Sequence, residues 1–276
     1  MKVLVLIANT FRELIAKATL VILLAISTLI IIGTLLSFSS EKTDAGVALL
    51  MFGNPVTQPV PEEELTQAIQ GVQVGLVGGL FFGIIIFGVF ATAGIIPDVL
   101  EKGAVDLYLS KPIARWQLLL GRYLGAVVVV MLNITYFIGA IWLIFGIRVG
   151  VWNEQFLLST FTLTFQFACL FSLVAFLGVL SRGAAIPILG AFLYLFVVGG
   201  LLHSREHGLY MISGNSVYHT ILDGLFYIFP QITGVQESAT KQIMHQPMDW
   251  KPFAQSAVSA GCFLAGAAII LHKKDF

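Results

Sequence analysis

The chain has 276 residues, of which 58% are hydrophobic and 11% are charged, and its formal net charge is zero. Its mean hydropathy of +0.93 is too high for a water-soluble domain of this size, and a transmembrane β-barrel is excluded because the apolar runs are continuous rather than alternating. The composition therefore predicts an all-α polytopic membrane protein, organised as one domain over residues 1–276, with no nucleic-acid partner.

The first sixteen residues predict a short amphipathic helix. Its apolar residues recur at helical spacing among mostly polar ones: Val3, Leu4, Ile7, Phe11, Leu14 and Ile15. We expect this helix, over 1–16, to lie in the membrane interface before the first span. A continuation of the first span into the cytoplasm is the alternative.

Six apolar runs are long enough to cross a hydrocarbon core about 30 Å thick. They cover residues 18–38, 72–96, 118–146, 156–180, 184–202 and 253–271. In the second run Gly75, Gly79 and Gly83 recur every fourth residue, and Gly121 and Gly125 repeat this spacing in the third. Such stripes let another helix approach closely, whether from the same subunit or from a second copy.

The basic residues predict how the molecule is oriented. Six spans place both termini on one side, and ten of the 15 basic residues fall on that side, whereas ten of the 15 acidic residues fall on the other. Because basic loops are retained in the cytoplasm, we expect a multi-pass protein of the cell (inner) membrane with both termini cytoplasmic.

The loop between the second and third runs predicts a short cytoplasmic helix over 98–110. Asp98 followed three residues later by Glu101 is typical of a capping box that opens a helix. Lys111 precedes Pro112, which ends that helix. A helix of this length is too short to span and too apolar to stay in water, so we expect it to lie against headgroups, this chain or another protein.

The stretch from Glu101 to Gly125 resembles the signature of ABC-2 family permeases, with an acidic residue and a glycine, a Leu-rich stretch, Pro-x-x-Arg and a glycine-containing helix start. The tail His272 to Phe276 and the external stretch Phe226 to Val235 are also similar to that family. The resemblance implies six spans, a cytoplasmic coupling helix at 98–110 and an external re-entrant-like segment over 203–252.

The resemblance also implies the permease subunit of an ATP-driven ABC exporter. The helix at 98–110 would dock on separate cytoplasmic ABC ATPase subunits, through contacts expected from Asp98, Glu101, Lys102, Asp106, Leu107, Tyr108 and Arg115. Lipid phosphates are the alternative contact for Arg115 and Arg122. A second permease copy, in a homodimer or a related heterodimer, would complete the transporter. Membrane lipids and an extracytoplasmic protein are further candidate partners.

We expect no cofactor in this chain, because it has no Gly-x-x-x-x-Gly-Lys-Ser/Thr loop for a nucleotide. ATP and Mg²⁺ would be bound by the partner ATPase, and the chain itself would not be an enzyme. The passenger stays open among lipid, drug, glycan, peptide and metal-related species. Force transmission to an external protein is also open.

Two other classes of function remain as alternatives. His203, Glu206 and His207 match the inverted H-x-x-E-H spacing of zinc proteases, which would make a membrane metalloenzyme. An ion-coupled secondary transporter is disfavoured, because the spans contain no acid or base near their middle. Asn133 and Gln166 are candidates to line a pathway between subunits, and hydrogen bonding between helices of one subunit is the alternative.

Overall fold

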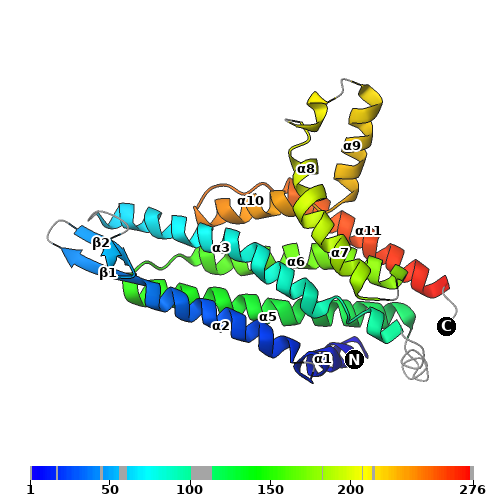
Figure 1. Ribbon diagram of the computed structural model, residues 1–276, viewed down its shortest axis with the longest axis horizontal. Coiled ribbons are helices and arrows are strands. Elements are labelled where there is room, and N and C mark those ends of the chain that lie inside the picture. Colours follow the sequence, from blue (N-terminus) through cyan, green and yellow to red (C-terminus); the bar gives the residue numbers. More distant parts are fainter. Residues whose placement is uncertain are drawn as a thin grey trace.

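The long helices of the chain run side by side along one axis (Figure 1). The computed structural model describes residues 2–16, 18–43, 46–55, 61–100, 114–181, 183–206, 208–212 and 215–273. The bundle contains α2 (Thr19–Ser37), α3 (Glu62–Thr92), α5 (Arg115–Val149), α6 (Glu154–Ser181) and α11 (Lys251–Lys273).

Five helices in the described ranges are long and apolar enough to cross a membrane. They are Leu20–Ser37, Arg115–Val149, Glu154–Ser181, Ala185–His203 and Lys251–Lys273, and each lies on one of the predicted runs. The remaining predicted run, 72–96, falls on α3, which begins ten residues earlier and whose 31 residues reach about 46 Å. A polytopic helical membrane protein is therefore confirmed, and a sixth crossing by α3 stays a prediction.

Helix α6 is the centre of the bundle, where it packs against α5, α10 and α11. Its Phe156, Phe167 and Phe171 are fully buried. Phe171 stacks on Tyr123 of α5, with ring centroids 5.7 Å apart. Because lipid tails are as apolar as these side chains, close van der Waals contact is what holds such helices together.

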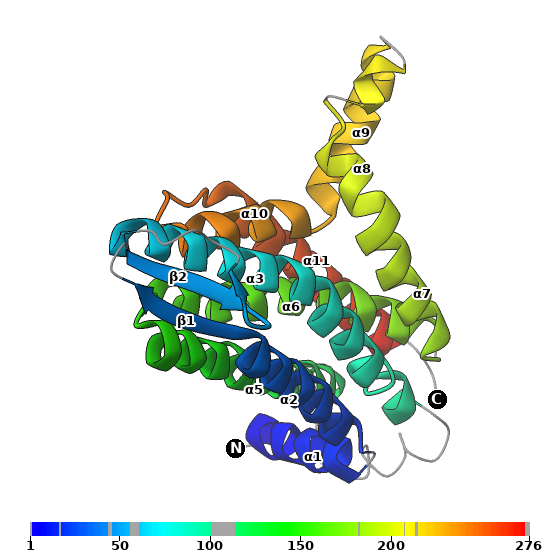
Figure 2. The same cartoon turned by 60° about the vertical axis from the view of Figure 1, so that its left-hand side comes forward.

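A small antiparallel sheet, which the all-α prediction missed, closes one end of the bundle (Figures 1 and 2). It consists of β1 (Phe38–Thr43), β2 (Gly46–Met51) and β3 (Asn54–Pro55), in that order. Phe52 and Gly53 join the last two strands with φ angles of 53° and 80°, as a two-residue hairpin turn requires. Val47 and Leu49 are buried, so this face of the sheet belongs to the core.

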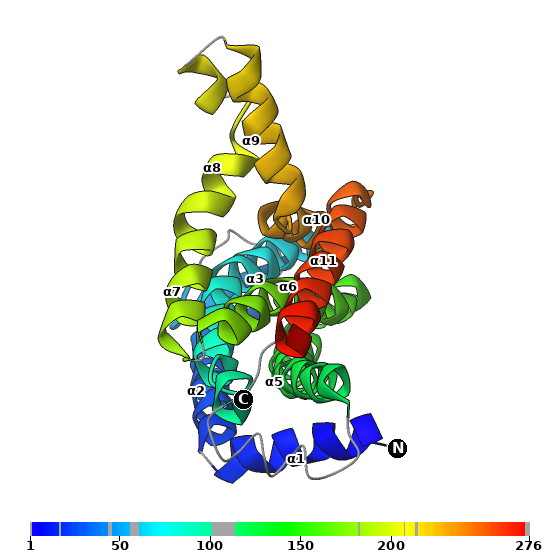
Figure 3. The same cartoon turned by 90° about the vertical axis from the view of Figure 1, so that its right-hand side faces the viewer.

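The opposite end of the bundle carries α1 (Lys2–Ala16), η1 (Pro97–Leu100) and the last turn of α11 (Figures 1 and 3). Ala18, with a left-handed φ of 56°, separates α1 from α2. The N-terminal helix is therefore a separate element, and the alternative of one continuous helix is wrong. That α1 lies in the membrane interface stays a prediction.

The fifth predicted run is an interrupted helix: α7 (Ala185–Leu193), the π-helical turn η2 (Tyr194–Val198) and α8 (Gly199–His203). The predicted external segment then contains η3 (Leu209–Met211), α9 (Ser216–Ile228) and α10 (Ile232–Ile243). Helices α8 and α9 form a hairpin that projects from the bundle, whereas α10 lies against α6 (Figure 3). No residue of α9 is buried within the described chain.

Candidate functional site

The start of the predicted coupling segment lies where several elements meet. Val99 of η1 forms a small apolar cluster with Leu6 of α1 and Leu118 of α5. Pro97 packs on Gly178 of α6, where an added Cβ would lie 3.3 Å from the proline ring. We call this region, together with Glu13 and Arg122, the terminal junction.

Helix α1 packs closely against the glycines of α5 that recur four residues apart. A Cβ at Gly121 would lie 2.6 Å from Leu6 Cβ, and one at Gly125 would lie 2.7 Å from Thr10 Cβ. The buried face of α1 therefore includes Leu6 and Thr10, which are four residues apart and share a helix face. Ile15, which was expected on the apolar face, is 44% exposed and does not belong to this contact.

An ion pair fastens α1 to α5. The Arg122 guanidinium donates a hydrogen bond to the Glu13 carboxylate, and the Arg122 side chain is only 3% exposed. The expectation that Arg122 reaches lipid phosphates is therefore wrong for this structure. A charge buried among apolar helices needs a partner of opposite sign, and α1 supplies it.

Arg115 joins α5 to α11. Its Nη1 donates to the carbonyl oxygens of Leu271 and His272, at 3.1 and 3.3 Å. The last carbonyls of a helix have no partner within the helix and carry partial negative charge, which a guanidinium satisfies. Arg115 therefore caps the end of a neighbouring span, and its predicted contact with an ATPase stays a prediction.

Only the start of the predicted coupling helix falls within the described residues. Asp98 lies in η1, and its backbone N–H donates to the Gly94 carbonyl at 2.9 Å. The other predicted contacts lie outside the described residues: Glu101, Lys102, Asp106, Leu107 and Tyr108. Their role at an ATPase surface stays a prediction.

The two candidate pathway residues both form hydrogen bonds between helices of this subunit. Asn133 Oδ1 accepts from Ser27 Oγ at 3.1 Å, and Gln166 Nε2 donates to the Ile232 carbonyl at 2.8 Å. Both side chains are buried. The interhelical alternative is thus observed, and a role in lining a pathway between subunits stays a prediction.

Sequence reasoning missed the amides that hold α10 in place. Asn153 Nδ2 donates to Gln73 Oε1 at 2.8 Å and to the Ile243 carbonyl at 3.1 Å. Thr162 Oγ1 donates to Gln242 Oε1 at 2.8 Å. Polar side chains next to long apolar runs were the available signal, because buried amides need hydrogen-bond partners.

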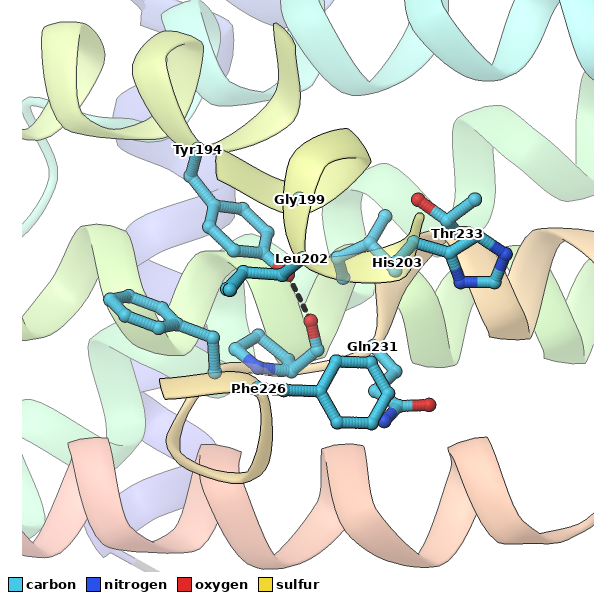
Figure 4. Close-up of a pocket in the computed structure, with 10 residues that line it drawn as sticks. Tyr194, Gly199, Leu202, His203, Phe226, Gln231 and Thr233 are labelled. Carbon is cyan, nitrogen blue, oxygen red and sulfur yellow. Dashed lines mark hydrogen bonds between the residues drawn. The ribbon is translucent and has the colours of Figure 1, made fainter. Parts of the chain in front are cut away.

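The π-helical turn is hydrogen-bonded to the short segment between α9 and α10. Tyr194 donates a hydrogen bond from its hydroxyl to the Pro230 carbonyl, and the two lie beside a small cavity lined by Leu202 and Phe226 (Figure 4). His203, at the end of α8, is 2.9 Å from Glu237 of α10. The interrupted helix thus forms one polar contact with the segment between α9 and α10 and another with α10 itself.

Within the projecting hairpin, Asp223 accepts hydrogen bonds from Arg205 Nε at 2.8 Å and from the Tyr210 hydroxyl at 2.6 Å. The Arg205 guanidinium also lies 3.5 Å from the centre of the Phe226 ring. The bonds from Tyr210 and Arg205 hold the pKa of the Asp223 carboxyl below its ordinary value. We call Arg205, Tyr210 and Asp223 the hairpin clasp.

His203 and Glu206, two residues of the zinc-protease spacing, do not lie on one helix. Helix α8 ends at His203, whose partner is Glu237, whereas Glu206 contacts Arg205 at 3.4 Å. His207 lies outside the described residues. In the part of the chain that the structure describes, no group of three or more His, Cys, Asp and Glu residues could hold a metal ion.

The sequence matches a protein family over residues 4–275, and the family is described as ABC-2 family transporter protein. The chain belongs to this family. The match contains α3, α5, α6, α10 and α11 in full, so it covers the bundle and the external segment alike. No curated protein matches the sequence. The molecule is therefore the membrane permease of an ABC transporter, and its family implies association with ABC ATPase subunits.

Proposed function

We propose that this permease is the transmembrane subunit of an ATP-driven exporter in which cytoplasmic ATPases act on the segment at 98–110. The observation that carries the proposal is the terminal junction. Val99, at the beginning of that segment, belongs to one apolar cluster with Leu6 of α1 and Leu118 of α5, and Pro97 lies against Gly178 of α6. A displacement of the segment would therefore reach three elements of the membrane domain at once.

The packing of the terminal junction supports the transfer of such a displacement. Closely packed side chains transmit strain rather than absorb it. The Glu13–Arg122 pair and the contact of Leu6 with Gly121 make α1 and α5 move together. Pro97 of η1 lies close to Gly178 of α6, so a displacement of η1 would also displace α6.

The half of α6 that begins at Glu154 connects this movement to the external segment. Gln166 and Thr162 bind the two ends of α10 through Ile232 and Gln242. A shift or rotation of α6 would therefore move α10, while both helices keep their internal hydrogen bonds. In this mechanism ATP and Mg²⁺ are bound by the ATPase, both termini are cytoplasmic, and a second permease copy, identical or related, completes the transporter.

Charge reversal in the coupling segment tests the proposal. We expect Glu101→Lys combined with Asp106→Lys to reduce co-purification of the ATPase by about tenfold or more, because reversing the charge of residues that form polar contacts across an interface costs several kcal/mol. Glu41→Lys, in β1 at the opposite end of the bundle, is the matched control and should retain the ATPase. Unchanged co-purification in the double variant, with normal membrane insertion, would rule out this segment as the docking site.

A further inference from the structure

A groove with a volume of about 600 Å³ lies between the first turn of α5 and the last turns of α11. Its walls include Trp116, Ala268 and Ile269. Trp116 is 54% exposed and Ile269 is 56% exposed, so large apolar side chains line an open surface at the ends of two spans. The size is in the range of ordinary ligand sites, roughly 300–1,000 Å³.

The rim of the groove is basic. Arg115, His272 and Lys273 line it, and none of the described residues that line it is acidic. The bonds from Arg115 Nη1 to the carbonyls of Leu271 and His272 fix the guanidinium at this position. Lys273 is exposed beside it. An occupant that matches this surface has one apolar part and one anionic part.

We propose that the groove binds an anionic phospholipid, with an acyl chain along Trp116 and Ile269 and its phosphate at Arg115 and Lys273. Basic pockets between spans on the cytoplasmic side attract anionic headgroups, and tryptophan is enriched at that depth of the bilayer. The inference rests on the proposed orientation, in which the end of the bundle that carries α1 faces the cytoplasm. It does not depend on docking of the ATPase.

Quenching of Trp116 fluorescence by brominated lipids tests this site in the full chain. The protein is reconstituted in phosphatidylcholine bilayers that contain brominated phosphatidylglycerol or, in parallel, brominated phosphatidylcholine. The Trp116→Phe variant supplies the contribution of the other tryptophans. We expect brominated phosphatidylglycerol to quench Trp116 with an apparent affinity at least about fivefold higher than brominated phosphatidylcholine does. Each basic residue near the membrane surface raises the affinity for an anionic lipid by about that factor.

The variants decide between a specific site and ordinary lipid contact. We expect Lys273→Gln with His272→Gln to reduce the preference for phosphatidylglycerol about fivefold or more. Lys251→Gln, at the other end of α11, is the matched control and should leave the preference unchanged. Equal quenching by both lipids, or a preference that survives the double substitution, would overturn the proposal. Relief of the quenching by soluble glycerol phosphate would also overturn it, because the phosphate alone would then occupy the site.

Discussion

At the scale of single residues, the buried Glu13–Arg122 pair shows how a charge is accommodated in an apolar bundle. Arg122 lies two turns inside α5, and its side chain is almost fully buried. Taking a charge out of water costs several kcal/mol unless a partner of opposite sign compensates for it. The stability of α5 in the bundle therefore depends on α1, which supplies the carboxylate that pairs with Arg122.

Removal of the Glu13 charge tests this dependence. We expect Glu13→Gln to lower the free energy of unfolding in detergent by about 1–3 kcal/mol, because Arg122 then stays buried beside a neutral partner. Arg12→Gln on the same helix is the matched control, since Arg12 is exposed and surface changes usually stay within about 0.5 kcal/mol. The pair would have no structural role if both variants unfolded at the same denaturant concentration.

The hairpin clasp should respond to acid through Asp223. Its folded-state pKa is held below the ordinary value, so the stabilisation is fully present above about pH 4 and is lost as the pH falls through the folded-state pKa. We expect backbone amide exchange in α9, corrected for intrinsic rates, to accelerate below about pH 4. This acid response should disappear in Asp223→Asn and persist in Asp249→Asn. An identical acid response in Asp223→Asn would assign the effect to another group.

At the scale of elements, the same glycine spacing has different consequences in α5 and α3. Gly121 and Gly125 of α5 receive Leu6 and Thr10 of α1. Added Cβ atoms on the α3 glycines at 75, 79 and 83 would meet nothing within 4 Å in this structure. The sequence pattern indicates where a helix can approach closely, but it does not indicate which helix does so.

Alanine substitutions at glycines of α5 test whether α1 packs directly against this helix. We expect Gly121→Ala to destabilise the packing of α1 against α5 by about 1–3 kcal/mol, since the added Cβ would overlap with Leu6. Amide exchange in α1 should then rise about tenfold. Gly139→Ala in the same helix meets nothing within 4 Å and should be neutral or slightly stabilising, because alanine favours helices by up to about 1 kcal/mol. Equal exchange in both variants would contradict a close seat.

At the scale of the whole molecule, two ends of unlike composition define a direction across the membrane. The terminal junction and the ends of α1 and α11 lie at one end, and the sheet lies at the other (Figure 1). The excess of basic residues on the first side predicts that this side faces the cytoplasm. Energy from a cytoplasmic ATPase can enter the molecule only if this orientation holds.

Cysteine labelling of whole cells measures the orientation directly. Cys262 is exposed and is first replaced by serine. We expect Asn54→Cys, in β3, to react with a membrane-impermeant maleimide on intact cells, and Lys273→Cys to react only after the cells are opened. The reverse pattern would place the terminal junction outside and would remove the route for ATP-driven movement.

The positions of five spans and the separate N-terminal helix could be predicted from the sequence, because each depends on the hydropathy of a contiguous segment. The sidedness indicated by the charges stays a prediction. Only the tertiary structure decided that Arg122 pairs with Glu13, that Gln166 holds α10, and that the chain between α2 and α3 forms a sheet. Arg122 and Glu13 are 109 residues apart in sequence, and Gln166 and Ile232 are 66 apart. Such contacts depend on which helix faces are brought together, and local composition does not determine that choice.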